Sequence, residues 1–198
     1  ALVRVTDDET PVGLRDRAVL EVLFGCGLRR AELIGLDLYD LDLARGCVTV
    51  RRGKGDKSRT VPVAGAAHEA LLEYLENGRP VLMSVHSDRA LFLSSTGRRM
   101  NTTTLRDRVI LYVNKARLTH PVTLHAFRHG FATSLIRGGA DVRHVQELLG
   151  HAEIDSTARY MHLQVADLVR VHGRSHPRDR LRTSKRIRQR ARPTSRRP

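Results

Sequence analysis

The feature that most limits the fold of this 198-residue chain is one β-hairpin pattern set among segments patterned for helices. Two runs rich in β-branched residues, CVTVR at 47–51 and RTVPV at 59–63, flank the polar segment RGKGDKS, which contains two glycines. Two such runs joined by a glycine-containing turn are typical of an antiparallel hairpin. The chain is therefore expected to contain one small antiparallel sheet.

Most other apolar residues recur at helical spacing, between glycine, proline or capping residues. The expected helices cover residues 16–24, 30–36, 67–76, 101–116, 123–137 and 141–150, then a helix from 155 or 156 that contains Tyr160, and a last one at 163–172. Asn77 to Pro80 are expected to stop the third helix, and ALFLS at 90–94 is a candidate edge strand. The predicted fold class is mainly α with a small antiparallel β-sheet.

The net charge of +14 is concentrated at one end of the chain. Residues 173–198 hold 11 basic residues and one acidic residue, so they carry +10 and residues 1–172 carry only +4. We expect a folded domain over 1–172 and a disordered Arg-rich tail over 173–198. Such a tail suits a polyanion such as nucleic acid, or an acidic membrane surface, although a purely solubilising tail is the simpler alternative. No aromatic or amphipathic face accompanies these charges, which disfavours the membrane.

Cysteine usage and hydropathy exclude several other classes. Cys26 and Cys47 fit neither a disulfide framework nor a zinc pattern, so we expect buried thiols in a reducing compartment. No apolar run approaches the ~20 residues that cross a bilayer, and no signal peptide is visible. We therefore expect a cytoplasmic protein. The chain starts without methionine, which suggests that an upstream domain is missing.

Two segments place arginine where it can bind an anion. His125 and Arg128 lie three residues apart in the first turn of an expected helix, whose free N–H groups also favour an anion. Arg29 follows GCGL in a tight junction between two helices, and Glu32 is placed to orient it. Each pair, taken alone, is equally well explained as a surface pair of little energetic value.

Two further segments add a cation and a nucleophile. Lys54 and Lys57 lie in the hairpin turn, where a lysine can reach a bound backbone, although a solvated basic turn is the simpler reading. His151 follows a helix end at Gly150, and Tyr160 lies nine residues later. A phenol becomes a nucleophile only when cations stabilise its anion or a base takes its proton. Most tyrosines are merely structural.

Taken together, these residues point to phosphoryl transfer without a metal. Arginines stabilise the charge of the pentacoordinate phosphorus, a tyrosine attacks it, and an acid protonates the leaving oxygen. The sequence contains neither a carboxylate cluster for Mg²⁺ nor a Walker loop for a nucleotide. We therefore expect no metal, no cofactor and no small-molecule substrate.

At these residues the chain resembles the tyrosine recombinase (phage integrase) family, and most of all its Xer-type recombinases and mobile-element integrases. The resemblance runs from about Leu14 to about Val171. GLRRAELIGL resembles the family's first arginine box, and VTVRRGKGDKSRTVPV resembles its hairpin with the catalytic lysine. LHAFRHGFATSLIRGGADVRHVQELLGHAEIDSTARYMH resembles its second box, with Phe127 where leucine is common.

The resemblance implies a role for each residue of the set. Arg29 and Arg128 would grip the scissile phosphate, and Glu32 would support the first of them. The remaining roles are those of Lys54 as general acid for the 5′-hydroxyl, His125 in proton transfer, His151 as a hydrogen-bond donor to a non-bridging oxygen, and Tyr160 as the nucleophile that forms a 3′-phosphotyrosyl link. We also expect DNA contacts from Arg30, Arg52, Lys57 and Arg59.

The family implies double-stranded DNA as the partner, and a tetramer on two DNA sites in which the last helix docks into a neighbouring subunit. Its members usually carry an upstream core-binding domain, which we expect to be absent from this sequence. A type IB topoisomerase or telomere resolvase would share the chemistry, but the chain's small size and Xer-like boxes favour a recombinase. A non-catalytic DNA-binding module is the alternative from a different class.

Overall fold

The computed structural model describes residues 2–6, 9–51, 58–119 and 122–150. Its elements follow the expected order of helices around one hairpin, which confirms the mainly helical class with a small antiparallel sheet. They are η1 (Leu2–Val5), α1 (Pro11–Cys26), α2 (Arg30–Gly35), η2 (Leu38–Asp40), β1 (Leu41–Asp42), β2 (Cys47–Val50), β3 (Arg59–Pro62), α3 (Gly65–Glu73), the π-helical turn η3 (Tyr74–Gly78), α4 (Arg79–Leu82), α5 (Thr102–Lys115), α6 (Leu124–Arg137) and α7 (Val142–Leu149). Among these residues no helix is long and apolar enough to cross a membrane.

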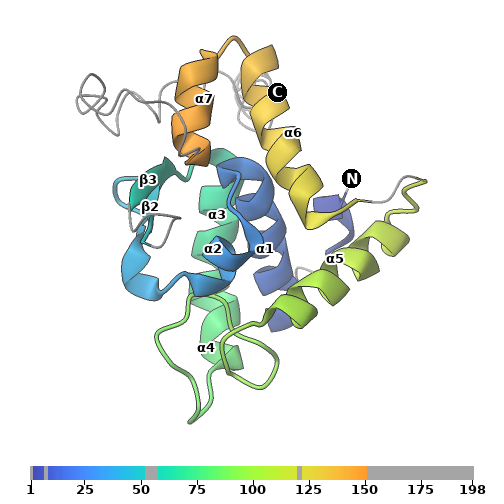
Figure 1. Cartoon of the computed structure of the whole chain (residues 1–198). Coiled ribbons are helices and arrows are strands. Elements are labelled where there is room, and N and C mark those ends of the chain that lie inside the picture. The colour runs from blue at the N-terminus through green and yellow to red at the C-terminus, as the bar shows by residue number, and fades with distance from the viewer. Residues whose placement is uncertain (1, 7–8, 52–57, 120–121, 151–198) are drawn as a thin grey trace, which may run out of the picture.

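Helix α1 lies at the centre of the described part, packed against α3, η3 and α6 (Figure 1). Pro11 stands in its first turn, and the Thr10 side chain accepts a hydrogen bond from the Gly13 N–H at 3.1 Å. Most of its residues are buried. A helix covered on nearly all sides needs no polar face, which explains why its apolar residues do not form a narrow stripe.

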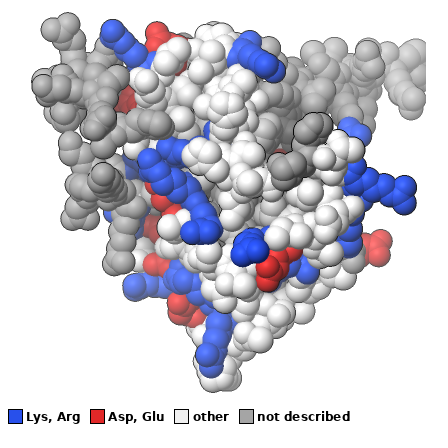
Figure 2. Space-filling view, turned by 45° about the vertical axis from the view of Figure 1, so that its right-hand side comes forward, with Lys and Arg blue, Asp and Glu red and all other residues white. Residues whose placement is uncertain are grey.

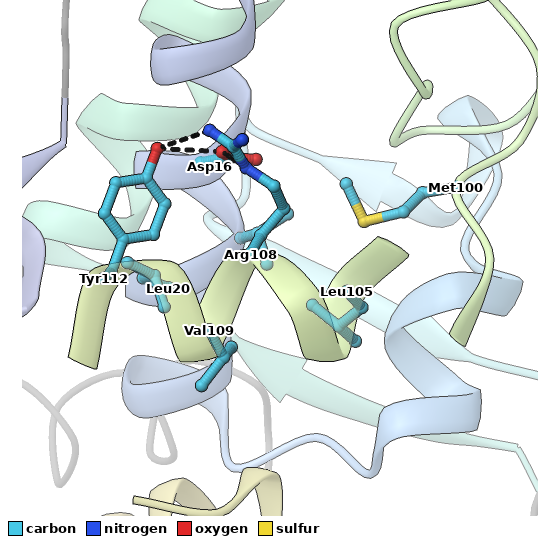
Figure 3. A pocket seen from close by; sticks show the side chains of 8 residues that line it. Asp16, Leu20, Met100, Leu105, Arg108, Val109 and Tyr112 are labelled. Carbon is cyan, nitrogen blue, oxygen red and sulfur yellow. Dashed lines mark hydrogen bonds and ion pairs between the residues drawn. The ribbon is translucent and has the colours of Figure 1, made fainter. Parts of the chain in front are cut away.

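A buried charge network ties α5 to α1 (Figure 3). The Asp16 carboxylate accepts hydrogen bonds from Arg15 Nη2 at 2.7 Å, from Arg108 Nε at 2.5 Å and from the Tyr112 hydroxyl at 2.8 Å. Burial, followed by the charge of Asp16, raises the pKa of Tyr112 to about 12. The depression that these side chains line has no room for a water molecule. This network therefore has a structural role, which is to hold α5 against α1.

The sheet has the order β1-β2-β3 and is antiparallel throughout, with Val48 opposite Val61 and Val50 opposite Arg59. The predicted hairpin is confirmed, and the two-residue strand β1 was not predicted. The prediction of an edge strand at 90–94 was wrong, because only isolated bridges form at Ala90 and Leu93. Arginine side chains take those two carbonyls instead: Arg79 binds the carbonyl of Ala90, and Arg15 that of Leu93.

The helix expected to stop at 77–80 continues to Leu82. The π-helical turn Tyr74–Gly78 widens the backbone here, and the Arg79 N–H bonds to the carbonyl of Tyr74. The wider turn accommodates Pro80 in the first turn of α4, a position where the missing N–H of proline costs little. The predicted stop was therefore wrong because a π-turn, rather than a break, accommodates the proline.

Helices α6 and α7 lie side by side at one end of the molecule, with α7 next to β3 (Figure 1). The side chains of Thr123 and Asp141 cap their N-termini, and Gly150 ends α7 with a positive φ of 64°. Phe127, Phe131 and Leu135 form the inner face of α6 and are buried. Phe131 packs directly on the backbone at Gly27, the residue that ends α1.

Gly27→Ala tests this close approach. The residue has a φ of +61°, and an added Cβ would lie 2.4 Å from the Phe131 ring. We expect the free energy of unfolding to fall by about 2–4 kcal/mol in urea denaturation, because strain and clash add. Gly139→Ala is the control, since its φ of +88° brings strain but no atom lies within 4 Å of the added Cβ. An equal loss in both variants would contradict the packing argument.

Candidate active site

Three arginines and one glutamate meet at the C-terminal end of α7. Arg29 precedes α2, Glu32 lies within α2, Arg59 begins β3, and Arg128 lies on α6. Residues almost 100 positions apart therefore share one site. We call these four residues the arginine cluster.

The last carbonyls of α7 hold the three guanidinium groups. Leu148 O accepts from Arg59 Nε at 3.0 Å, Leu149 O accepts from Arg128 Nη2 at 2.5 Å, and Gly150 O lies 3.3 Å from Arg29 Nη2. The final carbonyls of a helix have no partner within the helix and form the negative end of its dipole. Each of these three carbonyls is thus satisfied by a different arginine.

Glu32 balances part of this positive charge. Its carboxylate accepts from the Arg29 backbone N–H at 2.7 Å and Arg29 Nη1 at 2.9 Å, and from Arg59 Nη1 and Nη2 at 2.8 and 2.7 Å. Burial opposes ionisation, but these hydrogen bonds, Arg59 first, hold the pKa of Glu32 at about 2. The carboxylate is therefore ionised at neutral pH.

Arg128 is the most deeply buried arginine of the cluster. It is 7% exposed, and Nη1 donates to the Gly27 carbonyl at 2.8 Å. Burial, and then the positive charge of Arg29, lowers the pKa of Arg128 to about 10, so it remains charged at neutral pH. Arg128 and Arg29 bind successive carbonyls, those of Leu149 and Gly150, so the two guanidinium groups share one site.

Arg29 is the open side of the cluster. Its side chain is 46% exposed, whereas those of Arg59 and Glu32 are 13% and 4% exposed. Three positive charges face one negative charge, and the guanidinium that reaches solvent retains donors for a further acceptor. An anion with several oxygens, such as a phosphodiester, fits this arrangement chemically.

The other predicted residues differ in their placement. His125 is exposed in the first turn of α6, and Arg30 is exposed at the start of α2. Arg59 was expected to contact DNA, but its guanidinium is directed to Glu32 and Leu148. Several predicted features lie outside the described residues: Arg52, Lys54, Lys57, His151, Tyr160, the two helices expected after 155, and the tail.

Sequence reasoning missed the tie between Arg59 and Glu32, and the role of the α7 carbonyls as acceptors. No spacing rule links these segments, since the contacts exist only once β3, α2 and α7 have packed.

No group of three potential ligands among histidine, cysteine, aspartate and glutamate lies close enough to hold a metal ion within the described ranges. On the face drawn in Figure 2, Lys and Arg side chains form several separate groups, with acidic side chains beside them.

Comparison with known proteins identifies the family to which the chain belongs. The model of the Phage integrase family matches residues 1–167, so the chain belongs to that family. The tyrosine recombinase XerC of Natranaerobius thermophilus is 44% identical over 181 residues, covering 89% of this chain and 60% of the relative. XerC of Myxococcus xanthus is 43% identical and is covered to the same extent, 60%. The chain thus spans about 60% of the length of these curated relatives.

Solved structures agree on the fold. The XerA recombinase has a TM-score of 0.66 at 30% identity, over 97% of this chain and 63% of that one. XerH in a post-cleavage complex with its palindromic difH substrate has a TM-score of 0.64 at 26% identity, over 95% of this chain and 50% of that one. The described fold is that of a tyrosine recombinase catalytic domain.

Glu32→Gln tests the charge balance through pH. The pKa of about 2 lies below the ordinary 4.5, so the unfolded chain takes up this proton first as the pH falls. The stability that Glu32 contributes is present above about pH 4.5 and is lost as the pH falls towards 2. The variant should lose about 1–2 kcal/mol in urea unfolding at neutral pH, with the deficit shrinking in acid. Glu147→Gln, on the exposed face of α7, should show no such dependence, and a constant deficit for Glu32→Gln would contradict the balance.

Proposed function

We propose that this chain is the catalytic domain of a site-specific DNA recombinase or integrase, which cleaves and rejoins DNA strands through a 3′-phosphotyrosyl intermediate. One observation carries the proposal. Arg29 and Arg128, from two segments about 100 residues apart, both reach the end of α7 at the residues directly before His151. Family membership supplies the reaction class, and the cluster supplies the anion-binding chemistry.

The proposed reaction needs neither a metal nor ATP. Arg29 and Arg128 bind the non-bridging oxygens of the scissile phosphate, together with His151. The Tyr160 oxygen attacks phosphorus and its proton passes toward His125, while the P–O bond to the 5′-oxygen breaks and Lys54 protonates that oxygen. The phosphodiester energy stays in the phosphotyrosyl bond. Attack by a 5′-hydroxyl reverses these steps and releases the tyrosine.

The proposed partner is double-stranded DNA, and XerH, which shares the fold, was solved with its difH substrate. Arg30, Arg52 and Lys57 are proposed to contact DNA phosphates, and the tail 173–198 to add non-specific affinity. Membership of the family also leads us to propose a homo- or hetero-tetramer on two DNA sites, joined by exchange of the helix expected at 163–172. On the same basis we propose that a separate core-binding domain acts with this domain, and that the protein works in the cytoplasm on the nucleoid.

Covalent trapping tests this function. The probe is a pool of labelled, nicked duplexes of randomised sequence, in which cleavage near the nick releases a short fragment and prevents rejoining. We expect wild-type protein to form an SDS-resistant labelled adduct. Tyr160→Phe should abolish it because no nucleophile remains, and Arg128→Lys should slow its formation about 100-fold because a buried bidentate donor is lost.

Tyr39→Phe is the matched control, since Tyr39 is exposed and lies outside the cluster. An adduct that persists in Tyr160→Phe, or none with wild-type protein, would contradict the proposal. Relaxation of a supercoiled plasmid without a specific site would favour a topoisomerase instead. Tight DNA binding without cleavage, altered by Arg29→Ala only as far as its charge requires, would favour a non-catalytic module.

A further inference from the structure

Arg59 has the contacts of a residue that holds other side chains in place. All three of its donor nitrogens are engaged: Nη1 and Nη2 on the two oxygens of Glu32, and Nε on the carbonyl of Leu148. Its side chain is 13% exposed. A guanidinium whose fork is directed at a buried carboxylate offers little to a DNA phosphate.

The position of Arg59 joins three segments. It begins β3, shortly after Lys54 and Lys57 in the sequence, and its partners lie in α2 and at the end of α7. A Cβ added to Gly150 would lie 3.1 Å from both Cδ and Nη1 of Arg59, so the backbone that leads to His151 packs directly on this side chain. Arg59 is therefore held by Glu32 of α2 and by the backbone at the end of α7.

The division of Glu32 between two arginines has a chemical consequence. Arg59 binds it through two parallel hydrogen bonds, whereas the Arg29 side chain makes one, from Nη1 at 2.9 Å. A buried carboxylate that lost Arg59 would draw in the remaining cation, because an unpaired charge in a protein interior is costly. Arg29 is the cation with room to turn towards Glu32, since its side chain is 46% exposed.

We propose that Arg59 is a positioning residue, which neutralises Glu32 and fixes it to the end of α7 so that the outer donors of Arg29 stay available to a phosphate. This inference rests on the proposed function for its biological meaning. Its physical content, the availability of Arg29 to an oxyanion, is separate from cleavage and is measurable without it.

The first experiment uses the full chain and inorganic phosphate as the probe. Side-chain NMR of ¹⁵N-arginine reports phosphate binding at Arg29 and Arg128. Arg59→Gln should weaken this binding about tenfold, because Glu32 then captures Arg29. Arg59→Gln combined with Glu32→Gln should recover most of the loss, because no unpaired carboxylate remains. Arg59→Lys keeps the charge but cannot bridge three acceptors, so we expect a smaller loss of a few fold.

Arg99→Gln is the matched control. Arg99 is also partly buried and binds a carboxylate, that of Asp37, but shares no partner with the cluster. It should leave phosphate binding unchanged even if it destabilises the fold. Equal binding in Arg59→Lys and wild-type protein would reduce the role of Arg59 to charge alone. A double variant no better than Arg59→Gln would overturn the capture of Arg29.

The second experiment measures adduct formation with the nicked duplex pool and, separately, DNA affinity as a function of salt. A positioning role predicts that Arg59→Gln slows adduct formation by at least about tenfold with little change in the salt dependence of binding. If the salt dependence falls by about one phosphate contact while the adduct rate is unchanged, Arg59 is a DNA contact and the inference is wrong. Absence of an adduct with wild-type protein would count against the proposed function, whereas the phosphate titration would still decide the role of Arg59.

Discussion

The rest of the site depends on the hydrogen bonds that three arginines donate to the carbonyls at the C-terminal end of α7. Three successive carbonyls, at residues 148 to 150, receive one guanidinium each from Arg59, Arg128 and Arg29. A helix end presents unsatisfied acceptors at the negative pole of its dipole, so it gathers cations that would otherwise repel one another. Together with Glu32 and the Gly27 carbonyl, this acceptor surface offsets the three positive charges.

Two buried carboxylates show how similar chemistry serves different purposes. Asp16 is enclosed by Arg15, Arg108 and Tyr112, and the depression beside it has no room for water. Glu32 is also buried, but one of its partners, Arg29, reaches solvent with 46% of its side chain exposed. The first network joins helices, because Arg15 and Tyr112 are buried and Arg108 reaches across from α5 to Asp16 on α1. The second has the chemistry of the proposed anion site, because one of its cations, Arg29, faces solvent.

The sequence predicted most of the helices because their capping residues act locally. Thr123, Asn101 and Asp141 each accept a hydrogen bond from the backbone of the first turn, and Gly27 and Gly150 adopt the positive φ that ends a helix. The errors arose where side chains from distant segments compete for backbone groups. At 90–94 two arginines take carbonyls that a strand would have used, and at 74–78 a π-turn carries the helix past Pro80.

The sequence by itself determined the family, the order of the helices around one hairpin, and the residue types of the proposed phosphate site, because motifs and caps depend on neighbours a few positions apart. Only the tertiary structure decided that Arg59 binds Glu32, that Arg128 is buried beside Gly27, and that the end of α7 collects all three arginines. Such contacts join segments tens of residues apart. Their geometry exists only after the helices have packed, so no local pattern encodes it.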